Sequence, residues 1–235
     1  MFKYPNFLIL QNKLFLITIP RIVVTAFVIL QALGMLVYSG GSLHNKTAVG
    51  YSFTRNFFSD LGLNRAYNGD LNFLSMALFT ISLIFVGLAF MFYYSAILQF
   101  FKKDLINYRL SIVGSIFAIG GSIALIGTGV TPADLVLDIH IFFANSIFKC
   151  FMVTSFCYTI VIYRSNILEK KYALGYGIFF LLITLYVGVL EFAPPARLSE
   201  TSLMFQVVTQ KLIVLTFCLS IVYQTFGFSK SSIFD

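Results

Sequence analysis

Six long apolar stretches dominate this chain and leave little choice of fold. Each is about as long as the 20 residues that an α-helix needs to cross the hydrocarbon core of a bilayer. The strands of a membrane barrel would instead alternate in segments of about ten residues. The sequence therefore predicts an all-α, polytopic membrane bundle of six transmembrane helices. The expected spans are about 21–40, 71–100, 110–130, 139–163, 172–192 and 203–226.

The composition excludes a soluble globule. The chain is 59% hydrophobic and 11% charged, whereas soluble domains are about 25% charged. Its net charge of +7 comes mostly from basic residues in short loops, where they indicate topology and contacts with anionic lipid head groups rather than nucleic acid. We therefore expect the lipid bilayer as partner, no nucleic acid and no cofactor. The oligomeric state stays open.

Loop charges predict the orientation of the bundle. Four basic residues lie on one side, namely Lys46, Arg55, Arg65 and Arg197. Ten lie on the other side, namely Lys3, Lys13, Arg21, Lys102, Lys103, Arg109, Arg164, Lys170, Lys171 and Lys230. Cytoplasmic loops carry an excess of Lys and Arg, so both termini are expected in the cytoplasm.

The sequence outside the spans divides into three parts. Polar residues interrupt the apolar N-terminus and no clean cleavage site follows, so we interpret 1–19 as an interfacial segment rather than a signal peptide. The connection 41–70 is long for a compact protein and is expected to have a role or structure of its own. Residues 227–235 form a C-terminal tail, and 20–226 is the six-helix domain.

The long outer connection contains a candidate amphipathic helix. Thr54 is a plausible N-cap and Gly62 a plausible residue just past the helix end. At helical spacing Phe57, Phe58 and Leu61 share one face, while Ser59 and Asp60 lie on the other. Either this helix is a lid packed on the bundle, or Ser59 and Asp60 face a polar pocket. A carboxylate among apolar residues needs a partner.

A second polar group stands at the outer mouth of the fourth span. Asp138 is placed to act as an N-cap. His140 follows in the first helical turn, where the helix dipole favours a neutral imidazole that could act as a base or metal ligand. Under an enzyme reading the catalytic residues are Asp60, Asp138 and His140, joined in one variant by His44. No metal ligand set is predicted.

Two lysines lie deep inside predicted spans. Lys149 is about 13 Å below His140 at 1.5 Å per residue, and Lys211 lies at a similar depth in the sixth span. Such lysines are expected to face the bundle interior and find partners. We predict a pocket for an anionic group, lined also by Asn145, Glu191, Gln210 and Ser59; a buried polar clamp between helices is the alternative.

Missing residues exclude several functional classes. The two histidines cannot supply the four ligands of a dihaem cytochrome or a three-histidine zinc centre. No phosphate-binding loop, no dinucleotide-binding glycine motif and no His–Ser pairing typical of an intramembrane serine protease is visible.

Two short motifs resemble a known family. The segment Tyr51-Ser-Phe-Thr-Arg-Asn-Phe-Phe-Ser-Asp-Leu-Gly62, and Gly127-Thr-Gly-Val-Thr-Pro-Ala-Asp134 with His140 after it, are similar to a six-span prokaryotic membrane family catalogued as a domain of unknown function (nine-nine-eight). A more distant likeness is to eukaryotic six-span autophagy modulators and GPI-remodelling proteins. The resemblance covers about 20–226. It implies six helices, an outer Ser-Asp-Leu-Gly loop and a paired Pro/Asp…His loop, but no reaction. Membership of a prokaryotic family would also imply the prokaryotic cell membrane.

Three functional readings follow from these residues. The first is a membrane protein that binds or moves a lipid or small anionic ligand through an outward-facing polar vestibule, using Lys149 and Lys211. The second is a lipid-modifying or metal-assisted enzyme using Asp60, Asp138 and His140. The third is an accessory or scaffold subunit without chemistry. The first requires a continuous polar cavity that reaches the lysines, and the second requires its three residues within hydrogen-bond reach or around a metal.

Overall fold

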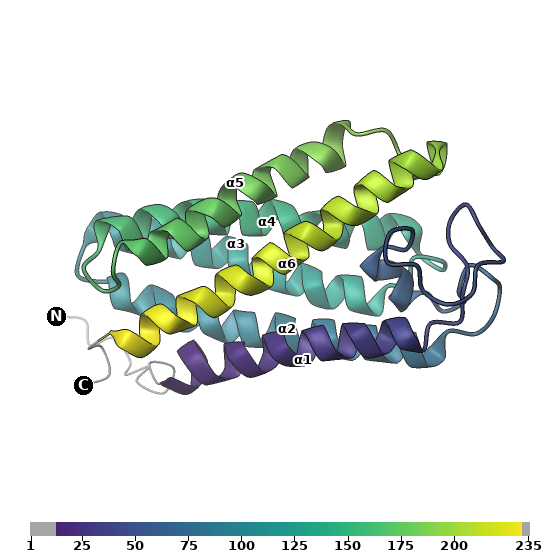
Figure 1. Ribbon diagram of the computed structural model, residues 1–235. Helices are drawn as coiled ribbons and strands as arrows, with labels where there is room; N and C mark the ends of the chain where they lie inside the picture. Colours follow the sequence, from purple (N-terminus) through teal and green to yellow (C-terminus); the bar gives the residue numbers. More distant parts are fainter. Residues whose placement is uncertain (1–12, 232–235) are drawn as a thin grey trace.

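The computed structural model describes residues 13–231, and six long helices make up most of them (Figure 1). Each helix is long and apolar enough to cross a membrane. The all-α bundle predicted from the sequence is therefore confirmed, and the chain is an integral, multi-pass membrane protein. The helices are α1 (Ile19–Leu36), α2 (Phe73–Ile97), α3 (Leu105–Val130), α4 (Leu137–Arg164), α5 (Lys171–Phe192) and α6 (Glu200–Lys230).

The first span differs from its predicted bounds. A π-helical turn, Leu14–Thr18, runs directly into α1, so the helical segment is Leu14–Leu36. Pro20 is the second residue of α1 and directly follows the π-helical turn, and the helical segment continues through it. The helix ends at Leu36, and Gly40 and Gly41 take positive φ values of 132° and 83° in the connection that follows. Residues 1–12 of the predicted interfacial segment lie outside the described residues.

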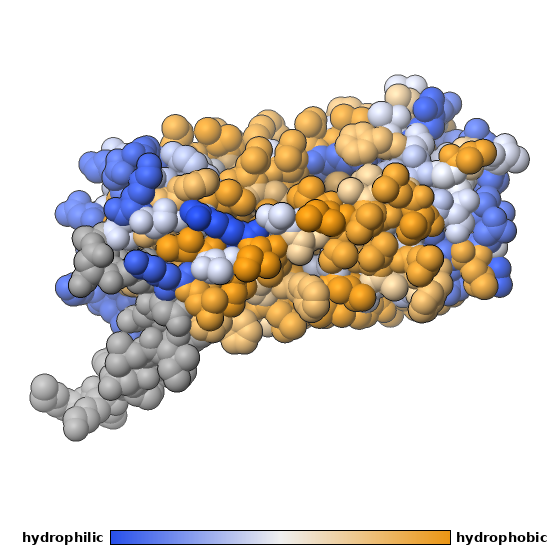
Figure 2. Space-filling view, turned by 60° about the horizontal axis from the view of Figure 1, so that its bottom comes forward, coloured by the Kyte–Doolittle hydropathy of each residue, from blue (hydrophilic) through white to orange (hydrophobic). Residues whose placement is uncertain are grey.

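The two ends of the bundle carry different connections. The long connection between α1 and α2 lies at one end, together with the α3–α4 and α5–α6 turns, and we call this the loop end (Figure 1). The α4–α5 turn and the C-terminal end of α6 lie at the opposite, terminal end. Figure 2 shows an apolar belt between two hydrophilic ends, as expected for a protein that spans a bilayer.

Helix α6 crosses the bundle diagonally. Helices α2, α3 and α4 pack in sequence, with α3 against α4 as the closest pair. Helix α6 packs against α5 and more lightly against α1, and it passes in front of the others in Figure 1. Phe217 of α6 stacks on Phe179 of α5 and meets Phe151 of α4 at 4.5 Å between ring centroids. Towards the loop end, this crossing leaves an apolar cavity between α6 and α2–α4.

Glycines on α3 allow its close approach to α4. A Cβ atom at Gly121 would lie 2.8 Å from the ring of Phe151, which is 1% exposed. Small residues have the same role in many membrane helix pairs, because packing rather than hydrophobic burial drives helix association in lipid.

We expect Gly121→Ala to destabilise the bundle, because the buried Phe151 ring has no free space to move into. The expected loss is about 1–3 kcal/mol, as for other overpacked cores. Thermal unfolding in detergent measures it. Gly188→Ala on α5 is the control, since nothing lies within 4 Å of a Cβ placed there. Equal melting temperatures for wild type and Gly121→Ala would contradict the packing argument.

Candidate functional site

The connection between α1 and α2 folds over the loop end of the bundle, but the helix predicted within it is shorter than expected. Only a 3-10 turn forms, at Phe58–Gly62, with Phe57 as its N-cap residue. Thr54 therefore does not cap a helix, which corrects the prediction from the sequence. The reason lies in Asn56, because its side-chain oxygen accepts a hydrogen bond from the Ser52 amide and fixes a turn before the helix begins.

Asn56 is the hydrogen-bonding centre of this segment. It is completely buried. Its side-chain amide donates to the carbonyl of Gly41 and to Oδ2 of Asp60, both at 3.0 Å. Every polar atom of the side chain is therefore used, and three parts of the connection are joined through one residue.

Asp60 is buried beneath the same segment and is 5% exposed. Its Oδ2 accepts a hydrogen bond from the Phe57 amide at 3.0 Å, so the carboxyl caps the 3-10 turn. Among the described residues no cation lies within ion-pair distance of this carboxyl. Burial raises the pKa of Asp60 to about 7, although hydrogen bonds from Asn56 and Phe57 and the charge of Lys211 act to lower it.

Lys211 attaches the connection to α6. The lysine is 5% exposed, which confirms that it faces the bundle. Its Nζ donates to the backbone carbonyl of Asn56 at 2.5 Å, and the Tyr51 hydroxyl donates to the same oxygen at 2.9 Å. The ammonium also lies over the rings of Tyr51, Phe53 and Phe58, at 5.4, 5.0 and 5.2 Å from their centroids. Glu191, which was predicted to line the same pocket, pairs with Lys149 and not with Lys211. We call the set Tyr51, Asn56, Asp60 and Lys211 the loop clamp.

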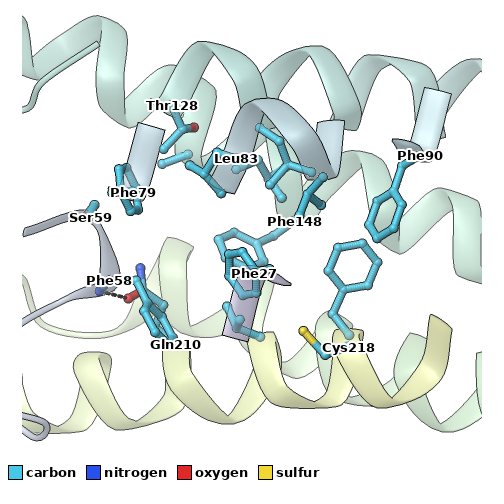
Figure 3. Close-up of a pocket in the computed structure, with 16 residues that line it drawn as sticks. Phe27, Phe58, Ser59, Phe79, Leu83, Phe90, Thr128, Phe148, Gln210 and Cys218 are labelled. Carbon is cyan, nitrogen blue, oxygen red and sulfur yellow. Dashed lines mark hydrogen bonds between the residues drawn. The ribbon is translucent and has the colours of Figure 1, made fainter. Parts of the chain in front are cut away.

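The neighbouring residue on α6 makes a second attachment. Oε1 of Gln210 accepts a hydrogen bond from the Phe58 amide at 2.9 Å. This contact closes the segment over an apolar cavity between α6 and α2–α4 (Figure 3). Ser59, predicted to face a polar pocket, instead lines this largely apolar one.

We call this cavity the slot. The centre of a water-sized sphere can move through about 90 Å³ of it, whereas roughly 10–15 Å³ of such space is enough to admit one water molecule. Its lining extends from Gln210 to Cys218 on α6, about 12 Å at 1.5 Å per residue. The slot is therefore narrow and elongated. It is lined by Phe27, Phe58, Ser59, Phe79, Leu83, Val86, Phe90, Leu125, Thr128, Ala144, Ile147, Phe148, Gln210, Val214, Phe217 and Cys218.

Lys149 does not face the bundle interior, which corrects the sequence prediction. Its ammonium pairs with Glu191 at 2.6 Å, and the two side chains are 50% and 45% exposed. The buried stripe of α4 instead carries Ile147 and Phe151, so Lys149 falls on the outer face of that helix. Asn145, one turn away, is partly buried on α4 and does not line the slot. The two deep lysines are therefore not brought together around one cavity.

The three residues of the enzyme reading are not joined by hydrogen bonds in the described structure. Asp138 is exposed, and Val136 rather than Asp138 stands at the N-cap of α4. His140 is 4% exposed, and its Nδ1 donates to the Thr131 carbonyl at 2.6 Å. Its Nε2 is buried without a partner. Within residues 13–231 no group of three His, Cys, Asp or Glu side chains is placed to hold a metal ion.

The remaining outer charges secure the loop end. The carboxylate of Asp134 accepts hydrogen bonds from the amides of Asn64 and Arg65, at 2.9 and 3.0 Å. Arg55 pairs with Glu200 at the start of α6. His44 donates to the carbonyl of Ala196 in the α5–α6 turn at 2.8 Å. The clustering of acids at this end thus serves to fasten the connections to one another.

Sequence reasoning missed two contributors to this region, Asn56 and Thr128. Asn56 was not singled out from the sequence, although its position four residues before Asp60 in an aromatic-rich segment was an available signal. Thr128 lies within an apolar span and its hydroxyl bonds its own helix, as many threonines in membrane helices do, so nothing local marks it as a cavity residue.

Comparisons with protein-family models, curated proteins and solved structures find no match to this chain. The resemblance to the six-span prokaryotic family stays a prediction that rests on the two motifs.

Replacing Asn56 should free the outer segment. We expect Asn56→Ala to destabilise the protein by about 2–4 kcal/mol, because it leaves Asp60 buried with fewer donors. Protease cleavage in the connection should rise, measured by limited proteolysis in detergent. Asn145→Ala on α4 is the control, because Asn145 lies outside the clamp. Equal cleavage rates in Asn56→Ala and Asn145→Ala would show that the clamp does not hold the connection in place.

Asp60 should make stability depend on pH. Its folded pKa of about 7 exceeds the ordinary value of roughly 3.9. Between these two values the folded state therefore binds a proton that the unfolded state does not. The stability that this protonation gives to the folded state is complete below about pH 4 and is lost as the pH rises towards 7. We expect the free energy of unfolding to fall by at most about 1.4 kcal/mol per pH unit in that window. Asp60→Asn should remove this component, and an unchanged pH profile in that variant would refute the assignment.

Proposed function

We propose that this membrane protein binds a lipid by holding one hydrocarbon chain in the slot. The observation that carries the proposal is the slot itself, an elongated apolar cavity whose lining includes no charged side chain. Ligand sites in proteins are typically apolar with a few polar groups that fix orientation. A slender chain fits the space better than a complete two-chain lipid, since the slot is narrow and elongated.

The loop clamp supports the same proposal. The segment that carries Phe58 and Ser59 forms the wall of the slot at the loop end, and Lys211 and Gln210 hold it to α6. Because the buried Lys211 ammonium binds the Asn56 carbonyl, we assign it the role of fastening the connection to α6 rather than of binding an anion. We therefore favour lipid binding over small-anion binding.

We also propose an orientation of the bundle in the membrane. The terminal end carries the larger set of basic residues, so we place it in the cytoplasm and the slot in the outer half of the membrane. The resembled family suggests the cell membrane of a prokaryote. The slot would then receive lipid from the outer leaflet.

Filling the slot should abolish lipid retention. In Val214→Phe the added ring enters the slot, since Val214 lines it. Leu212→Phe, two residues away on the same helix and 58% exposed, is the matched control. Native mass spectrometry of protein purified in mild detergent should show lipid adducts for wild type and Leu212→Phe, with at least a tenfold loss for Val214→Phe. Adducts of equal intensity in both variants would refute the proposal.

A further inference from the structure

The polar groups of the slot gather at one end. Ser59, Thr128 and Gln210 lie towards the loop end, whereas Phe90 and Cys218 lie at the other (Figure 3). A hydrocarbon chain with a small polar head would therefore enter in one direction only, with its head beside these three side chains.

These side chains offer neutral hydrogen bonds. Gln210 uses Oε1 for the Phe58 amide, which leaves its NH₂ group as donor. Thr128 donates its proton to the Ala124 carbonyl, so its oxygen is left as an acceptor. Ser59 can donate or accept. Such a set matches a hydroxyl or an ester carbonyl.

The nearest cation is not available to the slot. Lys211 adjoins Gln210 in sequence but does not line the cavity. Its ammonium is occupied by the Asn56 carbonyl and surrounded by the rings of Tyr51, Phe53 and Phe58. An ionised head in the slot would therefore lose its hydration without gaining a counter-ion, which is strongly unfavourable.

From this arrangement we infer that the slot selects a single-chain lipid with an uncharged hydroxyl or ester head, of the monoacylglycerol type, and rejects ionised fatty acids. This inference rests on the proposed function, because it assumes that the slot holds a hydrocarbon chain. It adds the chemical class of the ligand and the residues that distinguish it.

A tryptophan reporter makes the inference testable. The chain contains no tryptophan, so Phe27→Trp, at the wall of the slot, introduces a single fluorophore. A monoacylglycerol with a dibrominated chain should quench it on binding in detergent. The dibrominated fatty acid of the same chain length, at pH 8 where it is ionised, should bind at least tenfold more weakly.

The outcomes separate the two proposals. Quenching by neither probe, with Phe27→Trp still folded by its thermal transition, would overturn chain binding itself and the inference with it. Equal or stronger quenching by the ionised fatty acid would leave the proposed function standing and overturn the neutral-head inference.

Ser59 provides a second measurement. Ser59 lines the slot but takes no part in the clamp. Ser59→Ala in the reporter background should weaken monoacylglycerol binding about fivefold, as for one neutral hydrogen bond. Ser146→Ala, an exposed α4 hydroxyl bonded only to the Phe142 carbonyl, should leave affinity unchanged. Unchanged affinity in Ser59→Ala would also overturn the assigned head contact.

Discussion

A bilayer offers no water to satisfy polar groups, and this constraint governs the structure. The carbonyl of Asn56 shows how it is met where the outer connection meets α6. This carbonyl receives hydrogen bonds from Lys211 and Tyr51, so a buried cation and a non-helical backbone satisfy each other. Non-helical backbone at such a position is tolerated when it is buried in protein. The wall of the slot at the loop end depends on this contact.

The segment from Asn56 to Asp60 contributes both to the loop clamp and to the wall of the slot. Asn56 and Asp60 fix the turn that presents Phe58 and Ser59 to the cavity, while Gln210 holds the Phe58 amide. The hydrogen bonds of the clamp therefore lie on the loop-end side of the slot, and the remaining walls of the slot are apolar. A site with a polar end and an apolar body suits a lipid, which has a polar head and an apolar chain. It suits a free anion less well, because the cation present is already enclosed.

The acids at the loop end have a structural role that their clustering in the sequence alone does not reveal. Asp134 binds the amides of Asn64 and Arg65, and Glu200 pairs with Arg55, so both secure the connections at the loop end. His140 binds the Thr131 carbonyl and thereby braces the α3–α4 turn. Lys149 and Glu191 neutralise each other on the outer face of α4 and α5. The Lys149–Glu191 pair keeps two charges at membrane depth without a cavity between them.

The sequence by itself determined the six spans, because a helix of about 20 apolar residues has few alternatives to a bilayer. It also indicated that Lys211 is buried and that the segment around Ser59 and Asp60 is special. Only the tertiary structure decided which lysine faces inward, since a position on a uniformly apolar helix does not reveal which face meets lipid. It alone showed that Thr128 and Gln210 line the same cavity, and it joined Asn56 to Lys211, 155 residues apart in sequence. Such contacts depend on how helices cross, and no local pattern encodes that crossing.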